Sequence, residues 1–273
     1  MPDVAVVTDT TAYLPEENVH QYGITVIPII VNFEDGFIYD GMVNLREFFD
    51  RVERSERLPV TSQPPLGQFI QIYEKLVGDG KEVVSIHISS ELSGTVESAR
   101  TAAKMVDESK ITVVDSLQIL GPMGYQVLEA AEGALAGLGR REIVERVEKV
   151  RREISFYFLP ATLDYLKKGG RIGGAEALLG TLLQIRPVLC IKDGRVEVVD
   201  KIRTWKKAVD RILQEMPRQY GALRVGVGHC LAPDAMEQVR QAILREAPEA
   251  VLDVWTLGPA IGIHIGPGAI GVG

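Results

Sequence analysis

The chain contains 273 residues, of which 46% are hydrophobic and 25% are charged, and it carries a formal net charge of −7. This length and composition predict a globular protein with a sizeable core, organised as one large domain or two of ordinary size. The acidic balance argues against nucleic acid as the main partner, because phosphate backbones are bound by basic surfaces.

The two cysteines, Cys190 and Cys230, stand far apart and outside any CxxC motif, so neither a zinc site nor a disulfide framework is expected. Histidines, cysteines and carboxylates nowhere have metal-ligand spacing, and we expect no metal. The N-terminus lacks the apolar segment of a signal peptide, and no run reaches the roughly 18 apolar residues of a membrane span. These features predict a soluble, cytoplasmic protein.

In the first half of the chain, short apolar strands alternate with amphipathic helices. The expected strands are 4–7, 24–31, a run from Val83 and 111–114, and the expected helices begin at Pro15 and span 44–56, 66–77, 96–106, 118–138 and 140–153. Asp35-Gly36 predicts a hairpin turn, and three prolines predict a stiff loop at 58–65. The pattern is typical of a mostly parallel sheet with helices on both faces, where ligand-prone loops follow the strands.

The second half differs, because hairpins are interspersed with helices. The expected strands are 156–158, a hairpin at 188–199, 223–227 and 251–257, and the expected helices are 162–167, 175–183, 205–216 and 233–246. A glycine-rich basic loop at 167–174 fits neither a P-loop nor a dinucleotide-binding motif and supports no nucleotide site. We predict an α/β protein with domains at 1–155 and 156–273, the second being an α+β unit whose mixed or antiparallel sheet is covered by helices on one side.

A strand-to-helix turn, Ser89-Ser90-Glu91-Leu92-Ser93-Gly94-Thr95, concentrates hydroxyl groups and backbone N–H donors at the start of a helix. Two interpretations stand side by side: the turn binds a carboxylate or phosphate, or Ser89 or Ser90 merely caps the helix. Thr61 and Ser62 offer either a second set of hydroxyl donors or loop caps.

The remaining candidates are single basic residues. His20, His87 and His229 have local settings that favour surface or core roles, whereas His264 and Arg171 lie in glycine-rich segments whose backbone can approach a ligand closely. By composition alone, Arg203 after the hairpin is best interpreted as a solvated charge. The sequence contains neither a GxSxG nor an HExxH motif.

Seven short segments support a more specific prediction. They are 7–15 (VTDTTAYLP), 61–64 (TSQP), 89–95 (SSELSGT), 115–116 (DS), 166–172 (LKKGGRI), 201–203 (KIR) and 264–269 (HIGPGA). In this order they resemble the DegV family, the fatty-acid-binding proteins that act as lipid-binding subunits of bacterial fatty acid kinase. Each segment is weak alone, but together they cover nearly the whole chain and are specific.

The resemblance implies two α/β domains with a long-chain fatty acid, such as palmitate, stearate or oleate, in a tunnel between them. It places the carboxylate on the hydroxyls of Ser93 and Thr61. The neighbouring residues that it implies are Ser62, Ser90, Gly94 and Arg171. It assigns Arg203 and His264 to phosphoryl transfer with a partner kinase.

Three positions depart from the family pattern. Pro65 stands where the family often has serine after Thr-Ser-Gln-Pro, and Gly173 and Ile265 stand where a hydroxyl residue commonly follows the Arg-Ile pair and the terminal histidine. The named donors are all retained, so we expect these departures to affect water positions or kinase docking.

The resulting hypothesis is a binding subunit without activity of its own. It sequesters a fatty acid and presents the carboxylate to an ATP-dependent fatty acid kinase subunit, which yields acyl phosphate for phospholipid metabolism. Contact with the membrane is expected to be transient. Two alternatives remain: a passive lipid carrier or sensor without a kinase, and a stand-alone hydrolase that uses Ser93 with His264.

Overall fold

The chain divides into two compact units, each with its own sheet and core. The computed structural model describes residues 3–179, 185–215 and 224–273. The first unit comprises Met1–Met42 and Val60–Ile154, and the second comprises Val43–Pro59 and Ser155–Gly273. The second unit therefore takes in helix α2 (Leu45–Arg54), although the domain boundary predicted from the sequence would assign this helix to the first domain.

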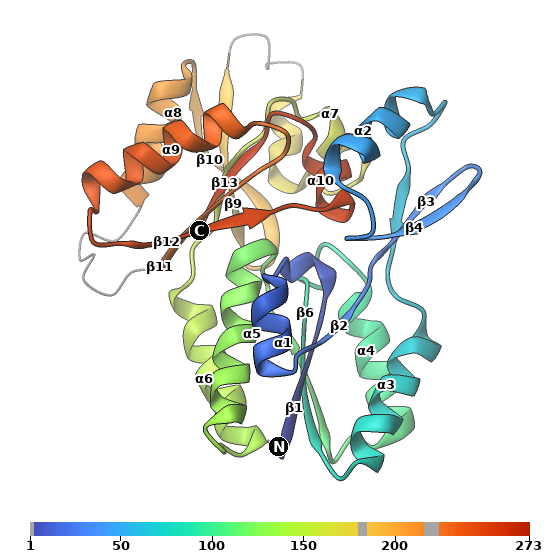
Figure 1. Cartoon of the computed structure of the whole chain (residues 1–273). Helices are drawn as coiled ribbons and strands as arrows, with labels where there is room; N and C mark the ends of the chain where they lie inside the picture. The colour runs from blue at the N-terminus through green and yellow to red at the C-terminus, as the bar shows by residue number, and fades with distance from the viewer. Residues whose placement is uncertain (1–2, 180–184, 216–223) are drawn as a thin grey trace. The chain divides into compact units, whose positions relative to one another are not determined.

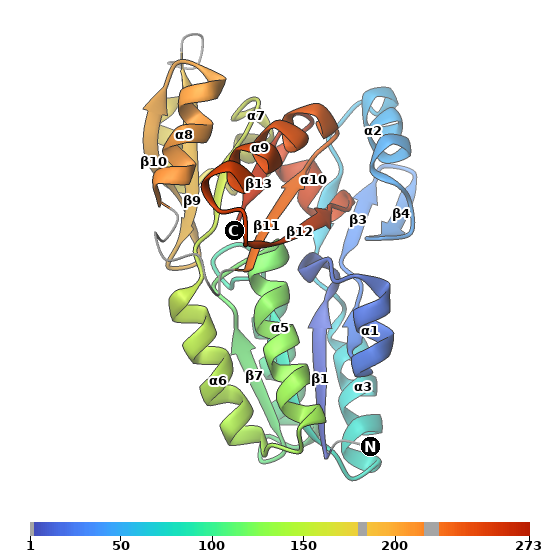
Figure 2. The same cartoon turned by 60° about the vertical axis from the view of Figure 1, so that its left-hand side comes forward.

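The first unit is built on a four-stranded parallel sheet with the order β2-β1-β6-β7 (Figure 1). The strands are β1 (Val4–Asp9), β2 (Thr25–Ile27), β6 (Glu82–His87) and β7 (Ile111–Asp115). Helices α3 (Leu66–Gly78) and α4 (Thr95–Val106) cover one face, and α1 (Glu16–Tyr22), α5 (Leu120–Leu135) and α6 (Arg140–Glu153) cover the other (Figure 2). The predicted parallel sheet with helices on both faces is confirmed.

Strands β1 and β6 lie side by side in this sheet, but the chain leaves their carboxyl ends toward opposite faces. After β1 it enters α1, which packs near α5, and after β6 it enters α4, which packs against α3. Open α/β sheets bind ligands at such a point, because the two diverging loops leave a crevice beyond the strand ends. The topology therefore directs attention to the carboxyl ends of β1 and β6.

A second, antiparallel sheet of three strands also belongs to the first unit. Its order is β4-β3-β5, formed by β3 (Ile30–Phe33), β4 (Gly36–Tyr39) and β5 (Val60–Ser62). The predicted hairpin at Asp35-Gly36 is confirmed, since Phe33 pairs with Gly36. The predicted single strand 24–31 is wrong because Pro28, which has no N–H to donate, separates β2 from β3.

The proline-rich loop 58–65 also contains more structure than predicted. Strand β5 pairs with β3, and Thr61 stands opposite Val31. Pro59 precedes the paired residues and Pro64 follows them, so neither proline removes a hydrogen bond from the ladder.

The second unit contains a six-stranded mixed sheet with the order β10-β9-β8-β13-β11-β12. The strands are β8 (Tyr157–Leu159), β9 (Arg186–Lys192), β10 (Arg195–Ile202), β11 (Arg224–His229), β12 (Val251–Thr256) and β13 (Ile270–Val272). Only the β11–β12 pair is parallel; the other described pairs are antiparallel. Helices α8 (Trp205–Glu215) and α9 (Pro233–Glu246) pack on one face, where Val188, Val227 and Ile212 belong to one buried cluster.

In the second unit, one predicted helix is wrong in detail, and two elements appear where none was predicted. The segment predicted as helix 175–183 forms a 3-10 helix, η2 (Gly173–Leu178), after the short helix α7 (Asp164–Lys168); residues 180–184 lie outside the described chain. The glycine-rich end contains helix α10 (Pro259–Ile265) and strand β13, joined by a turn that uses Gly266 and Gly268 at φ +73° and +88°. Within the described ranges, no helix is long and apolar enough to cross a membrane.

Candidate functional site

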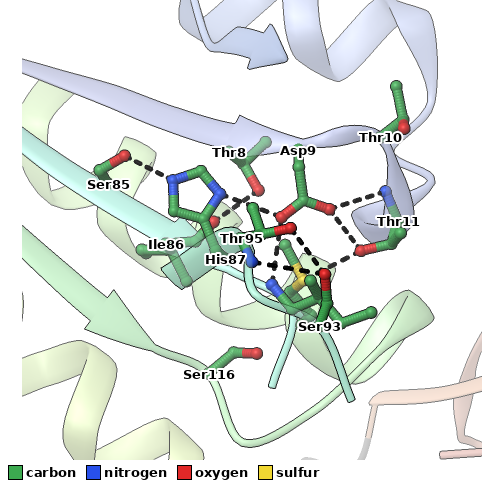
Figure 3. Close-up of polar contacts among 12 residues, drawn as sticks. Thr8, Asp9, Thr10, Thr11, Ser85, Ile86, His87, Ser93, Thr95 and Ser116 are labelled. Carbon is green, nitrogen blue, oxygen red and sulfur yellow. Dashed lines mark hydrogen bonds and ion pairs between the residues drawn. The ribbon is translucent and has the colours of Figure 1, made fainter. Parts of the chain in front are cut away.

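The first unit gathers buried polar side chains at the carboxyl ends of β1 and β6. Asp9 ends β1, and its carboxylate accepts hydrogen bonds from the backbone N–H groups of Thr11 (3.0 Å) and Ile88 (3.1 Å) (Figure 3). The Thr11 hydroxyl donates to the same carboxylate, and His87 Nδ1 lies 3.0 Å from Oδ2. One carboxylate thus contacts both loops that diverge at the switch point.

The hydrogen bonds continue from His87 into the core. His87 Nε2 lies 2.7 Å from Ser85 Oγ, and the Tyr73 hydroxyl donates to Ser85 Oγ at 2.8 Å. Asp9, His87, Ser85 and Tyr73 are all 0% exposed. Serine hydrolases use a Ser–His–Asp order of hydrogen bonds, but their serine must reach the substrate. Ser85 is sealed inside the unit, so this group does not act as a catalytic triad, and His87 lies in the core, one of the two settings expected for it from the sequence.

The serine-rich turn (Ser89–Thr95, hereafter the hydroxyl turn) follows β6. Its backbone is closed by hydrogen bonds from the N–H groups of Leu92 and Ser93 to the Ser89 carbonyl, both 3.0 Å. Helix α4 begins at Thr95 with Gly94 at the N-cap, and no side chain caps it. The interpretation that Ser89 or Ser90 caps the helix is therefore wrong.

Two serines of the hydroxyl turn have different hydrogen-bond roles. The Ser90 hydroxyl donates to Asp115 Oδ2 at 2.5 Å, and its backbone N–H points to Oδ1 of the same carboxylate. Ser93 Oγ lies 2.8 Å from Thr95 Oγ1 and accepts from the Thr95 N–H at 3.4 Å. Either hydroxyl of the Ser93–Thr95 pair can donate to the other, so the Ser93 proton can point to a ligand when Thr95 is the donor, whereas the Ser90 proton is committed to Asp115.

The loop after β5 lies against the hydroxyl turn. Gln63 Nε2 donates to Ser98 Oγ on α4 at 2.9 Å, and a Cβ on Gly94 would collide with the Gln63 side chain. On β5 itself, Ser62 Oγ accepts from Asn32 Nδ2 at 2.8 Å, and Thr61 is partly buried. The first unit therefore brings the predicted residues of segments 61–64 and 89–95 into one neighbourhood.

The second unit places Arg171 beside His264. Arg171 Nη1 donates to the Gly169 carbonyl at 2.6 Å, and Gly169 packs so closely on the His264 ring that a Cβ there would collide with it. Burial lowers the pKa of His264 from 6.5 to about 4, and the Arg171 charge acts in the same direction. Arg203 lies elsewhere in this unit, exposed between β10 and α8.

We expect the His264 imidazole to titrate near pH 4 and to be neutral at pH 7. Its folded-state pKa lies below the unfolded value, so the stability it contributes is present above about pH 6.5 and is lost as the pH falls toward 4. Between these pH values, wild type should lose up to about 3 kcal/mol more unfolding free energy than His264→Gln. NMR titration checks the midpoint, with His264→Gln assigning the signal; a midpoint at or above 6.5 would contradict the buried setting.

The departure from the family pattern at Gly173 has a structural reason. Gly173 adopts φ +51°, and a Cβ at this position would collide with the backbone carbonyl of Val196 on β10. A side chain there is disfavoured both by the backbone conformation and by a neighbour that cannot swing away.

Gly173→Ser should therefore lower the free energy of unfolding by about 3 kcal/mol, the sum of positive-φ strain and overpacking. Gly170→Ser is the matched control, because Gly170 also has a positive φ (+69°) but a Cβ added there would meet no atom within 4 Å. That variant should lose only about 1 kcal/mol. Urea denaturation measures both; equal losses would show that the contact with Val196 costs nothing.

The sequence did not predict that Gln63 packs on the hydroxyl turn, nor that Asp9, His87 and Ser85 form a buried hydrogen-bonded group just before it. Ser85 and His87 share one face of an otherwise apolar strand, which was a usable signal, but their partner Asp9 lies 78 residues away from His87. Across the described ranges, no cluster of three or more His, Cys, Asp or Glu side chains is arranged to hold a metal ion, and both cysteines are free thiols.

Comparison with known proteins places this architecture in a family. The family model described as "Uncharacterised protein, DegV family" matches residues 3–273. A DegV domain-containing protein of Listeria innocua is 36% identical over 274 residues, covering 98% of this chain and 97% of that protein.

Solved structures match over the same extent. A DegV family protein from Thermus thermophilus, solved for its fatty acid binding, superimposes with a TM-score of 0.92 at 35% identity and covers 100% of this chain and 98% of its own. DegV of Bacillus subtilis, described as a fatty acid binding protein, gives a TM-score of 0.89 at 33% identity, with the same coverage. The chain belongs to the DegV family.

Proposed function

We propose that this protein binds a long-chain fatty acid and holds its carboxylate at the hydroxyl turn. The observation that carries the proposal is the match over the whole chain to DegV proteins described as fatty acid binding. The geometry of the first unit supports it: at the switch point, Ser93 can turn its hydroxyl proton to a ligand while it accepts from Thr95, and the loop that follows Thr61 and Ser62 lies against the same turn.

Neutral donors suit a carboxylate that is to react afterwards. Hydroxyl and backbone N–H groups bind the anion without transferring a proton to it, so the carboxylate stays nucleophilic. An acyl chain of about 15 methylenes gains on the order of 10 kcal/mol from burial, much of which is offset by the cost of binding. We also propose, from the family resemblance alone, that the acyl chain of the fatty acid occupies a tunnel between the two domains.

The test compares a fatty acid with the fatty alcohol of equal length. Delipidated protein is titrated with each in a calorimeter, and we expect the acid to bind at least about tenfold more tightly, because only the acid offers a charged acceptor. Equal affinities would show that the protein recognises the acyl chain and not the carboxylate. A fatty acid carrying a photoreactive group at its methyl end should label peptides of both units; labelling of one unit alone would remove the tunnel from the proposal.

We further propose that the bound carboxylate is presented in the cytoplasm to an ATP-dependent kinase subunit, which phosphorylates it to acyl phosphate. Arg203 and His264 would then stabilise charge on the transferring phosphoryl group. Mixing the protein with a candidate fatty acid kinase, ATP and fatty acid tests this. If no acyl phosphate formed while the fatty acid still bound, that kinase would not be the partner, and the passive carrier would be the better description of this protein.

A stand-alone hydrolase is the weaker candidate. Burial, together with the Arg171 charge, lowers the pKa of His264 and keeps the imidazole neutral at pH 7, as a general base requires, but Ser93 has Thr95 as its described hydrogen-bond partner. Turnover of an ester or phosphoester by the purified protein, abolished in Ser93→Ala, would favour hydrolysis over binding.

A further inference from the structure

We propose that Asp9 and His87 are positioning residues: they tie the loop after β6 to the loop after β1 and thereby hold Ser93 in place to receive a carboxylate. The identity of the ligand rests on the proposed function. The positioning itself is a property of the first unit and can be tested without any ligand.

The Asp9 carboxylate is the group that joins the two loops. Through Thr11 it fixes the residues after β1, and through the Ile88 N–H it fixes the first residue after β6 (Figure 3). The Thr11 hydroxyl also lies 3.7 Å from Met123 Sδ, which connects the same group to helix α5. Loss of this carboxylate would release the two loops from each other.

The path from Asp9 to Ser93 is short. Ile88 is held by Asp9, the next N–H (Ser89) donates to the Gln118 carbonyl at 3.0 Å, and the Ser89 carbonyl accepts the N–H of Ser93 at 3.0 Å. A displacement of Ile88 therefore shifts Ser93 through a single intervening residue, Ser89. Hydrogen-bond donors must be placed within a few tenths of an ångström to bind an anion well.

The donors run in one direction along the buried network. The Asp9 carboxylate already receives three protons from Thr11 and Ile88, so the proton between it and His87 belongs to Nδ1. Nε2 then accepts from Ser85, and Ser85 accepts from Tyr73, whose hydroxyl stays protonated because burial raises its pKa. His87 thereby has a single tautomer and a single ring orientation.

Complete burial explains why this arrangement is rigid. All four side chains are 0% exposed, so a broken hydrogen bond has no water to replace it. The edge of the His87 ring also packs against Phe69, with the ring centroids 5.3 Å apart at 84°. These contacts leave the carboxylate one position, which is what a positioning group requires.

Two substitutions at His87 separate positioning from stability. His87→Asn places an amide N–H where Nδ1 stood and keeps the donor to Asp9, whereas His87→Gln places its amide near the Nε2 position and removes that donor. We expect His87→Asn to keep fatty-acid affinity within about threefold and His87→Gln to lose about tenfold, the worth of one hydrogen bond. Tyr73→Phe is the matched control: it removes a buried hydrogen bond at the far end of the network and should leave the affinity unchanged.

The second readout is amide hydrogen exchange at Ile88 and Ser93 in the ligand-free protein. We expect faster exchange at both in His87→Gln and no change in Tyr73→Phe. Equal effects of these two variants on exchange would reduce His87 to a stabilising residue and overturn the inference. If wild type bound no fatty acid, the proposed function would fail, while the exchange comparison would still decide the positioning role.

A measurement on wild type guards against variants that do not fold. The nitrogen chemical shifts of His87 should show a ring protonated on Nδ1, with a slowly exchanging proton shifted downfield by its bond to Asp9. A ring protonated on Nε2 instead would overturn the inference, because Nδ1 would then have no proton to share with the carboxylate.

Discussion

Arg203→Ala will leave fatty-acid affinity unchanged and will lower the rate of acyl phosphate formation by about 100-fold. Arg203 is exposed after β10, in the second unit, whereas the proposed carboxylate contacts Ser93 and Thr61 belong to the first. A guanidinium that acts on the transferring phosphoryl group lowers the barrier to transfer, not the energy of the bound acid, so its removal affects turnover alone. Calorimetry with fatty acid and a reconstituted assay with kinase and ATP measure the two quantities.

Two control variants make the result specific. Lys207→Ala removes a positive charge from the exposed surface of helix α8 nearby and should change neither quantity. Arg203→Lys keeps the charge but not the planar pair of donors, and we expect an intermediate rate. If Arg203→Ala instead weakened fatty-acid binding and left transfer intact, the assignment of Arg203 to the phosphoryl group would be wrong.

Ser93→Ala will weaken fatty-acid binding by about 10- to 100-fold, which is the range expected for one hydrogen bond to a charged group. The carboxylate loses a donor that Thr95 holds in place, and no other atom of alanine can replace it. The alcohol of equal chain length should bind wild type and Ser93→Ala alike, because it lacks the charge that the hydroxyl stabilises.

Ser90→Ala is the matched control on the same turn. Its hydroxyl proton is committed to Asp115, so its removal should cost some stability and change fatty-acid affinity less than about threefold. A loss of affinity at Ser90 as large as that at Ser93 would mean that the carboxylate binds nearer the start of the turn.

Strong local signals predicted much of the fold. The bounds of α6 and α9 agree with the predicted helices, and Asn44 caps α2 by accepting from the Glu47 N–H at 3.0 Å. The predicted helix 118–138 is too long, because α5 begins at Leu120 and ends at Leu135. Helix α10 and strand β13 were missed because glycine-rich sequence has weak propensity, and their buried contacts determine their structure.

The candidate site shows the same division between local and distant information. The hydroxyl turn could be predicted from a strand followed by Ser, Gly and Thr before a helix, because that information is contiguous. Which serine hydroxyl can donate to a ligand could not be predicted, since the Ser90 hydroxyl donates to Asp115, which lies 25 residues further along the chain. The role of Asp9 was hidden for the same reason: its partner His87 becomes a neighbour only when β1 and β6 pair.

Mass spectrometry of lipid extracted from the purified protein tests the central claim most directly. We predict a long-chain fatty acid in near-stoichiometric amount from wild type, and a clear reduction in Ser93→Ala purified in parallel. Ser90→Ala should retain the wild-type amount. An extract without fatty acid, together with no binding of added fatty acid by the delipidated protein, would contradict the account.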